Sequence, residues 1–184
     1  MTPWEDPNSI WKTKSAYMSW LRGAVRRVWK DYPLRKEWKK NSLRPVTKQE
    51  KLSKVYHPST KNVGQCVFCK EWMAGSKLEC DHKLASMGCK SLEEAKEFLI
   101  YCGAATSEMF QLTCKNCHKI KTLSERQGTT FEDARVEKQV IALMRSSSVI
   151  QIATLLEMGY SGDLVSNAAK RKKVYREHLK GLEV

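Results

Sequence analysis

The residues best suited to chemistry are cysteines, histidines and one aspartate between positions 66 and 122. Two Cys-x-x-Cys pairs, at 66–69 and 114–117, are separated by 44 residues and enclose the adjacent residues Asp81 and His82. His118 directly follows the last cysteine. Two such pairs together offer four thiolates, the ligand set of a tetrahedral zinc ion. We therefore predict a structural zinc site made by Cys66, Cys69, Cys114 and Cys117.

Three of the seven cysteines, Cys80, Cys89 and Cys102, remain outside this set. Packing is their expected role, although Cys80 stands next to Asp81 and could replace one of the zinc-binding cysteines. An odd number of cysteines without a secretion signal favours reduced thiols and metal binding over disulfides. The first residues are acidic and lack an apolar run, so no signal peptide is expected, and no stretch approaches a membrane span. A cytoplasmic protein is expected.

Once the zinc is placed, Asp81, His82 and His118 resemble the motif of the HNH endonuclease family. This family is the zinc-bearing branch of the ββα-metal nucleases. The similarity is closest to phage-type members, which end in a stretch like Leu-Cys-x-x-Cys-His-x-x-Lys-Thr. The matching stretch here is Thr-Cys-Lys-Asn-Cys-His-Lys-Ile-Lys-Thr at 113–122, followed by Glu125. The resemblance covers about residues 66–125.

The resemblance implies a catalytic role for each residue of the motif. His82 would be the general base that activates a water molecule. Asp81 and His118 would hold one catalytic Mg²⁺ or Mn²⁺ ion, which stabilises the leaving 3′-oxygen. The implied reaction is hydrolysis of phosphodiester bonds in double-stranded DNA, leaving 5′-phosphate and 3′-hydroxyl ends. A phage homing or mobile-element endonuclease, acting in the cytoplasm of a bacterial host, is the implied biological role.

Two positions depart from the family pattern. The family usually carries asparagine five residues before the third knuckle cysteine, where it steadies the loop of the catalytic histidine. This chain has Met109 there, and Gln111 or Ser107 could replace the asparagine; otherwise activity would be reduced. Ala85 stands where proline is frequent, three residues after His82. Neither change removes the base or the metal ligands, so we expect an active enzyme.

The charge of the chain points to a polyanionic partner. Its formal net charge is +13, and residues 1–65, with 15 basic and 5 acidic side chains, supply +10 of it. A helix is predicted from Ser9 to Asp31, and a short basic helix from Leu34 to Asn41 after Pro33. The first carries a basic stripe that either contacts phosphates or is a solvated face: Arg22, Arg26, Arg27 and Lys30.

The remaining elements are predicted around the cysteines. Residues 42–65 suggest an extended basic linker, because they contain Pro45, Pro58 and Gly64 among scattered lysines. Short strands are expected at 77–81 and 109–113, with a helix from Ser91 to Tyr101 between them and another from Cys117 through Thr122. Ser91 should cap the helix, with Glu94 completing a capping box. Its apolar face is expected to contain Leu92, Ala95 and Leu99, with Phe98 as a further candidate.

The C-terminal part is expected to be helical. One helix is predicted at 131–145, and two shorter ones at 149–156 and 164–175 suggest a helix-turn-helix. A plain helical hairpin packed on the core fits the pattern nearly as well. The expected DNA-contacting residues here and after the last cysteine are Lys121, Ser166, Asn167, Lys170 and Arg171.

The predicted fold class is α+β, a small ββα-metal module with a four-cysteine zinc site and helical flanks. We expect a DNA-binding helical segment at 1–41, a linker at 42–65, the nuclease module at 66–128 and a helical segment at 129–184. Two other functions remain open. One is a catalytically weakened DNA-binding regulator or inhibitor, suggested by Met109. The other is a nuclease subunit of a phage DNA-packaging or host-takeover assembly.

Overall fold

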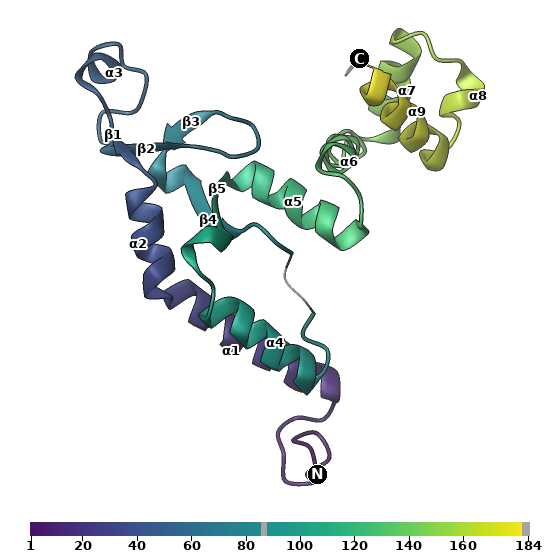
Figure 1. Cartoon of the computed structure of the whole chain (residues 1–184). Coiled ribbons are helices and arrows are strands. Elements are labelled where there is room, and N and C mark those ends of the chain that lie inside the picture. Colours follow the sequence, from purple (N-terminus) through teal and green to yellow (C-terminus); the bar gives the residue numbers. More distant parts are fainter. Residues whose placement is uncertain (86–87, 182–184) are drawn as a thin grey trace. The chain divides into compact units, whose positions relative to one another are not determined.

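The computed structural model describes residues 1–85 and 88–181. It combines helices with two small antiparallel sheets (Figure 1), in agreement with the predicted α+β class. The chain divides into two compact units, residues 1–118 and 119–184, which are considered separately below. Four segments were expected from the sequence. The first unit contains those expected at 1–41 and 42–65 and most of the one expected at 66–128.

Helix α1 (Lys14–Asp31) and helix α2 (Pro33–Asn41) open the first unit. The first was predicted to begin at Ser9 but begins at Lys14, because the side chain of Thr13 accepts a hydrogen bond from the Ala16 N–H and caps it. Pro33 occupies the first turn of α2, where its missing N–H costs no hydrogen bond.

The segment at 42–65 is folded, so the prediction of an extended linker was wrong. It forms strand β1 (Arg44–Pro45), helix α3 (Lys48–Leu52) and strand β2 (Asn62–Gln65), and β2 also pairs with β3 (Trp72–Ala74). A local sequence signal for this folded segment is a capping box. The Thr47 side chain accepts a hydrogen bond from the Glu50 N–H, and the Glu50 side chain accepts one from the Thr47 N–H. Arg44 holds Glu50 in a two-pronged ion pair, and burial of Val46 and Val63 anchors the segment.

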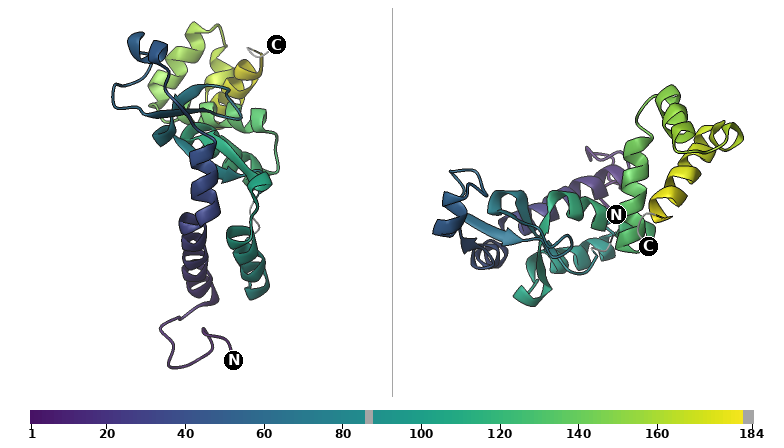
Figure 2. Two further views of the ribbon diagram at one scale, coloured as in Figure 1. Left: turned by 60° about the vertical axis from the view of Figure 1, so that its left-hand side comes forward. Right: turned by 90° about the horizontal axis from the view of Figure 1, so that it is seen from above.

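A second hairpin lies at the centre of the first unit (Figures 1 and 2). A 3-10 turn, η1 (Gly75–Lys77), leads into β4 (Leu78–His82), which pairs antiparallel with β5 (Phe110–Cys114) in a register that places Asp81 opposite Gln111. Helix α4 (Leu92–Gly103) and the turn η2 (Ser107–Met109) occupy the connection, and α5 (Lys115–Gln127) follows β5 directly. The two predicted strands are therefore present, with α4 between them and α5 after them.

Helix α4 packs on α1 through a face that was only partly predicted. Ser91 caps it as expected, but the Glu94 carboxylate accepts from the Lys90 N–H, one residue before the partner that a capping box requires. The predicted residues Ala95 and Phe98 are buried, whereas Leu92 and Leu99 are exposed. The shared core of the two helices contains Met18, Val25, Cys89, Ala95, Phe98 and Cys102.

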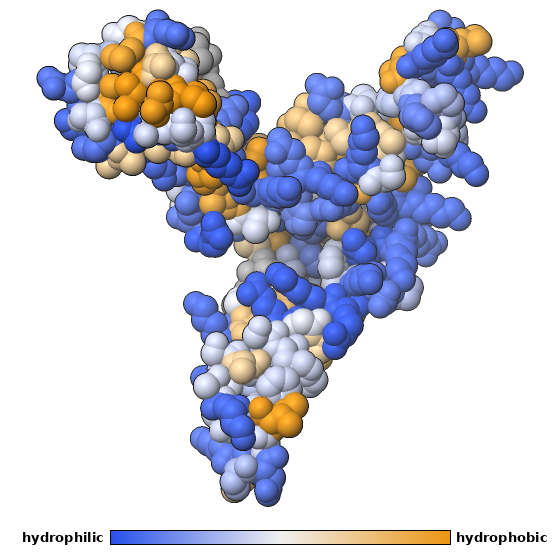
Figure 3. Space-filling model, turned by 180° about the vertical axis from the view of Figure 1, so that it is seen from behind, coloured by the Kyte–Doolittle hydropathy of each residue, from blue (hydrophilic) through white to orange (hydrophobic). Residues whose placement is uncertain are grey.

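The second unit is helical. After α5 it contains α6 (Phe131–Leu143), α7 (Ser148–Glu157), α8 (Gly162–Val165) and α9 (Ala168–Gly181). The helix predicted at 164–175 is split, because the Asn167 side chain accepts from the Lys170 N–H and starts α9 anew. The core of this unit is Val136, Val140, Leu155, Val165, Val174 and Tyr175. Apolar side chains also reach its surface (Figure 3), among them Val149, Ile150, Leu156 and Leu164.

Candidate metal centre

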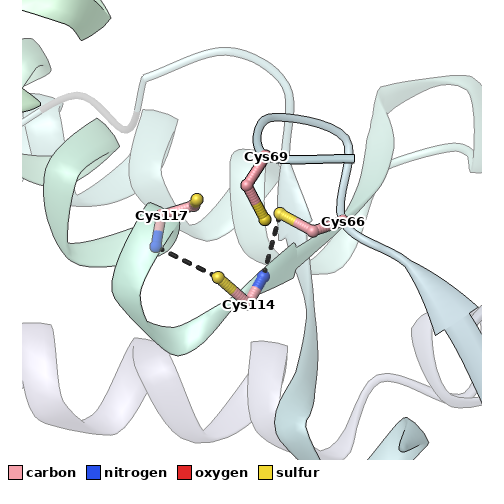
Figure 4. Close-up of side chains that lie close together, drawn as sticks. All are labelled: Cys66, Cys69, Cys114 and Cys117. Atoms are coloured by element: carbon pink, nitrogen blue, oxygen red, sulfur yellow. Dashed lines mark hydrogen bonds between the residues drawn. The ribbon is translucent and has the colours of Figure 1, made fainter. Parts of the chain in front are cut away.

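The four cysteines predicted to bind zinc lie together in the first unit (Figure 4). Their sulfur atoms are all within 4.8 Å of one another. In a tetrahedral site with zinc–sulfur bonds of about 2.3 Å, neighbouring sulfurs lie roughly 3.8 Å apart. The four cysteines can therefore hold a metal ion such as zinc after small adjustments. Among the residues that the structure describes, they are the only group of three or more metal-binding side chains as tightly clustered as this.

Each cysteine pair is held by a turn that the local sequence dictates. The first pair lies in the turn between β2 and β3, where Lys70 adopts a left-handed conformation (φ 59°) and its N–H donates to the Cys66 carbonyl. The second pair joins the end of β5 to the first turn of α5. The Cys114 N–H donates to the Cys66 sulfur and the Cys117 N–H to the Cys114 sulfur, each at 3.3 Å.

These hydrogen bonds prepare one thiol for metal binding. Burial by itself raises the pKa of Cys66, but N–H groups of Cys114, Cys69 and Phe68 directed at its sulfur outweigh burial and lower the pKa to about 7. The pKa of Cys69 is raised by burial, and that of Cys117 is raised by burial and by the neighbouring sulfurs. A bound cation would reverse such increases, because it stabilises thiolates.

The three cysteines outside this cluster are buried, as expected for packing residues. Cys80 lies with Ala105 and Phe110 in a small core, and burial raises its pKa to about 11. Burial raises the pKa of Cys102 to about 11 as well, and the pKa of Cys89 also lies above its ordinary value. None of these three cysteines is part of the four-cysteine cluster.

The structure brings Asp81 and His118 together. Along β4 the side chains alternate, so Glu79 and Asp81 share one partly exposed face, and His118 approaches this face from the first turn of α5. The His118 Nε2 lies 3.5 Å from the Asp81 Oδ1, and the His118 Nδ1 lies 2.6 Å from the Glu79 Oε2. We call Glu79, Asp81 and His118 the acidic face of β4.

Gln111 supports this face from the neighbouring strand. Its side-chain amide donates to the Asp81 carboxylate at 3.2 Å and to the His82 carbonyl at 3.1 Å. Of the two residues named as replacements for the usual asparagine, Gln111 is therefore the one that contacts both residues of the motif. Met109 bonds through its backbone carbonyl to the Lys83 N–H, which fixes the chain just after His82.

His82 lies on the other face of β4, inside an aromatic cluster. Only 3% of it is exposed, and its ring is sandwiched between Trp29 of α1 and Tyr101 of α4, with both ring centroids 3.9 Å away. Phe110 approaches from the paired strand, with its centroid 6.0 Å away. We call these rings the aromatic face of β4. The structure thus places the predicted base and the predicted metal ligands on opposite faces of one strand.

The predicted basic stripe of α1 is largely on the surface. Arg26, Arg27 and Lys30 are exposed, whereas Arg22 is partly buried with its guanidinium 5.9 Å from the Phe98 ring centroid. Two basic residues of α2 serve the hairpin instead: Arg35 and Lys39 donate to backbone carbonyls of β4, at 3.4 and 2.7 Å. Three of the four stripe residues are accessible to a phosphate backbone.

The residues predicted to contact DNA in the second unit have structural bonds. Arg171 is buried, and its guanidinium donates to Gln151 and to the Val165 carbonyl, which ties α7 to α8 and α9. Lys121 is also buried and forms an ion pair with Glu125 one turn further along α5. Ser166 and Asn167 are exposed but bond within their own turn, and the exposed Lys170 donates to the Asp163 carbonyl.

Glu79 is the polar residue at the acidic face whose contact with His118 was not predicted from the sequence. A signal for Glu79 was available, because it stands two residues before Asp81 in a predicted strand and must share its face. The register that puts Gln111 beside Asp81 needs the paired strand, which a single sequence does not specify.

No protein-family model matches the chain, and no curated protein and no solved structure matches it. Among the described residues, no single helix is long and apolar enough to cross a membrane, although α6 and α7 pass that test together as a pair bent by 117°. Val136 and Val140 of α6 and Leu155 of α7 are buried in the core of the second unit.

Proposed function

We propose that this protein is a metal-dependent DNA endonuclease of the HNH type. The observation that carries the proposal is the pairing of Asp81 with His118, 3.5 Å apart between the strand–strand hairpin and the helix that follows it. The four-cysteine cluster, which we propose holds a structural zinc ion, fixes the end of β5 and the start of α5 and so supports this pairing. A phage homing or mobile-element endonuclease remains the expected biological setting.

The donor atoms suit a hard divalent cation. Two adjacent ligands of an octahedral Mg²⁺ ion, at about 2.1 Å each, stand roughly 3.0 Å apart. The Asp81 and His118 donor atoms are close to that separation, and the side chains are 13% and 38% exposed. One carboxylate oxygen and one ring nitrogen would leave the remaining coordination positions to water and phosphate oxygens. When bound, such an ion would stabilise the leaving 3′-oxygen and the charge that develops on the phosphate.

Within this proposal, the protein's own groups orient the ligands and move the proton. Gln111 holds the Asp81 carboxylate through its side-chain amide, and the cysteine cluster holds His118. His82 would accept the proton of the attacking water. In the described conformation its ring is sandwiched between Trp29 and Tyr101, so acting as a base requires this ring to leave the aromatic face, or one of the two rings to move.

The partner in this proposal is double-stranded DNA. Residues 1–65 carry +10 of the net charge of +13, and Arg26, Arg27 and Lys30 lie exposed along α1 in the same unit as the acidic face. Neutralising phosphates with such residues releases counterions, which makes binding strongly dependent on salt concentration.

The test is cleavage of supercoiled plasmid DNA with Mg²⁺ or Mn²⁺, and with EDTA, by zinc-loaded wild type and by His82→Ala at matched zinc content. The expected result is cutting that needs the divalent ion and falls by about 10²- to 10⁴-fold in the variant. Wild type that binds DNA but never cuts it would overturn the proposal. A variant that cuts as fast as wild type would remove His82 from the mechanism.

The burial of His82 favours a second candidate, a DNA-binding regulator or inhibitor that has kept the fold and lost the chemistry. His82 is 3% exposed and packed between two rings, so it contributes to the core in the way that a buried aromatic side chain does. In that case binding to DNA persists, and neither Mg²⁺ nor Mn²⁺ produces cutting. The same plasmid experiment separates the two functions.

A further inference from the structure

A second carboxylate on the acidic face, that of Glu79, contacts the ring of His118. Its Oε2 lies 2.6 Å from the His118 Nδ1, the shortest contact that either side chain makes among those described. Both side chains are about equally exposed, 36% for Glu79 and 38% for His118. The other ring nitrogen, Nε2, lies 3.5 Å from the Asp81 Oδ1. One imidazole ring therefore bridges two carboxylates two residues apart on β4.

The fold determines this arrangement on both sides. Glu79 and Asp81 point the same way because they alternate with the buried Cys80, and each is held in register with β5, opposite Thr113 and Gln111. His118 follows Cys117 in the first turn of α5, so the cysteine cluster fixes its position. The contact consequently joins β4 to the first turn of α5.

A carboxylate at Nδ1 decides which ring nitrogen can bind a cation. An ionised carboxylate accepts hydrogen bonds and cannot donate them, so a neutral imidazole that bonds to it carries its proton on Nδ1. The lone pair is then on Nε2, the atom that faces Asp81. Histidine ligands of metal ions usually have such an acceptor on the other ring nitrogen, which fixes both the tautomer and the ring orientation.

We propose that Glu79 is a positioning residue that sets the tautomer of His118 and aims its Nε2 at the cation held with Asp81. This inference rests on the proposed function, since it assigns Glu79 a role toward the same cation. Glu79 acts through His118 and touches neither the DNA nor the reacting water.

The first test is the tautomer itself, measured by long-range ¹H–¹⁵N NMR at pH 8.5 on the zinc-loaded protein without Mg²⁺. The chain has 4 histidines, and His118→Gln identifies the relevant signals. Wild type is expected to carry the His118 proton on Nδ1. A proton on Nε2, or protons on both nitrogens, would overturn the inference.

The variants sharpen this test. In Glu79→Ala the proton is expected to redistribute toward Nε2. The same direction is expected in Glu79→Gln, because an amide can donate to Nδ1 as well as accept from it. Glu97→Ala, which removes an exposed carboxylate from α4, is the matched control and should leave the signals of His118 unchanged. A tautomer that is the same in wild type and Glu79→Ala would overturn the inference.

The second test is the affinity for Mn²⁺, followed by electron paramagnetic resonance without DNA. Removal of such a supporting carboxylate typically weakens binding by about 10- to 100-fold, so this loss is expected in Glu79→Ala and not in Glu97→Ala. If wild type shows no Mn²⁺ binding that depends on Asp81, the result counts against the proposed function. If wild type and Glu79→Ala bind Mn²⁺ equally tightly, only the role of Glu79 is overturned.

Discussion

The two faces of β4 differ in nearly every respect, although they belong to one strand of five residues. The acidic face is partly exposed: Glu79 and His118 are 36% and 38% exposed, and Asp81 is 13% exposed. The aromatic face is buried and packs His82 between rings from α1 and α4. The acidic face has the chemistry of a ligand site and contributes little to the core, whereas the aromatic face is part of the core.

The difference shows what an alternating strand can combine. Asp81 and His82 are adjacent in sequence, yet their side chains have opposite surroundings because side chains alternate along a strand. A residue pair that looks like one functional unit in the sequence is divided in space. The division makes different predictions for stability and for activity on the two faces.

Removing zinc should have the largest effect, because both faces depend on the hairpin that the cysteine cluster anchors. Zinc binding by four-ligand sites contributes about 10 to 16 kcal/mol in isolated zinc-finger peptides, so chelation should unfold much of the first unit. All 6 tryptophans lie at positions 4 to 72, so their fluorescence reports on this unit alone. A chelator that leaves the fluorescence unchanged while removing the metal would contradict the structural role of the cluster.

His82→Ala should have the second largest effect on stability, because it removes a ring from the core of the aromatic face. Loss of a buried ring that contacts three others is expected to lower the free energy of unfolding by about 2 to 4 kcal/mol. Urea denaturation of the zinc-loaded protein measures this. His57→Ala, at an exposed position, is the control and should change stability little. Equal stability of the two variants would mean that the ring does not pack as described.

Tyr101→Leu should expose His82 on the aromatic face, with a smaller loss of stability than His82→Ala. The tyrosine ring covers one side of His82, and its hydroxyl donates to the Leu84 carbonyl at 2.6 Å. We expect a loss of about 1 to 2 kcal/mol in stability and faster modification of His82 by diethylpyrocarbonate, located by peptide mass spectrometry. If His82 in the wild type already reacts as fast as the exposed His57, the ring is not protected and the comparison fails.

Gln111→Leu should act on the acidic face, with an effect on stability similar to that of Tyr101→Leu. It removes the two hydrogen bonds that hold the Asp81 carboxylate and the His82 carbonyl. Each such bond contributes about 1 kcal/mol, and more when the acceptor is charged. We expect a small fall in stability together with weaker Mn²⁺ binding, whereas Gln49→Leu, an exposed substitution on α3, should change neither.

Local sequence signals predicted much of this arrangement. The spacing of the cysteines predicted the cluster, and Ser91 predicted the start of α4. The strands expected at 77–81 and 109–113 lie within one residue of β4 and β5. Each of these signals acts over a few neighbouring residues. The capping box at Thr47 and Glu50 is equally local, and recognising it would have corrected the linker at 42–65.

What the sequence did not predict depends on contacts between distant residues. The sandwich around His82 brings together positions 29, 82 and 101, and no periodicity within one helix or strand specifies that meeting. Arg171 looks like a surface residue in a basic run, but its bonds to Gln151 and Val165 exist only once α7 and α9 have packed. Such contacts follow from tertiary packing, which overrides local expectation.

The most direct test of the central claim is plasmid cleavage by Asp81→Asn beside Asp31→Asn, which removes a charge of the same type from an exposed position at the end of α1. Asparagine keeps the shape of the side chain but loses the anionic oxygen that a hard cation needs. The account predicts Mg²⁺-dependent cutting by wild type and Asp31→Asn, and a fall of at least about 100-fold in Asp81→Asn with its zinc content and fold intact. Equal cutting by all three proteins would contradict a catalytic cation on the acidic face.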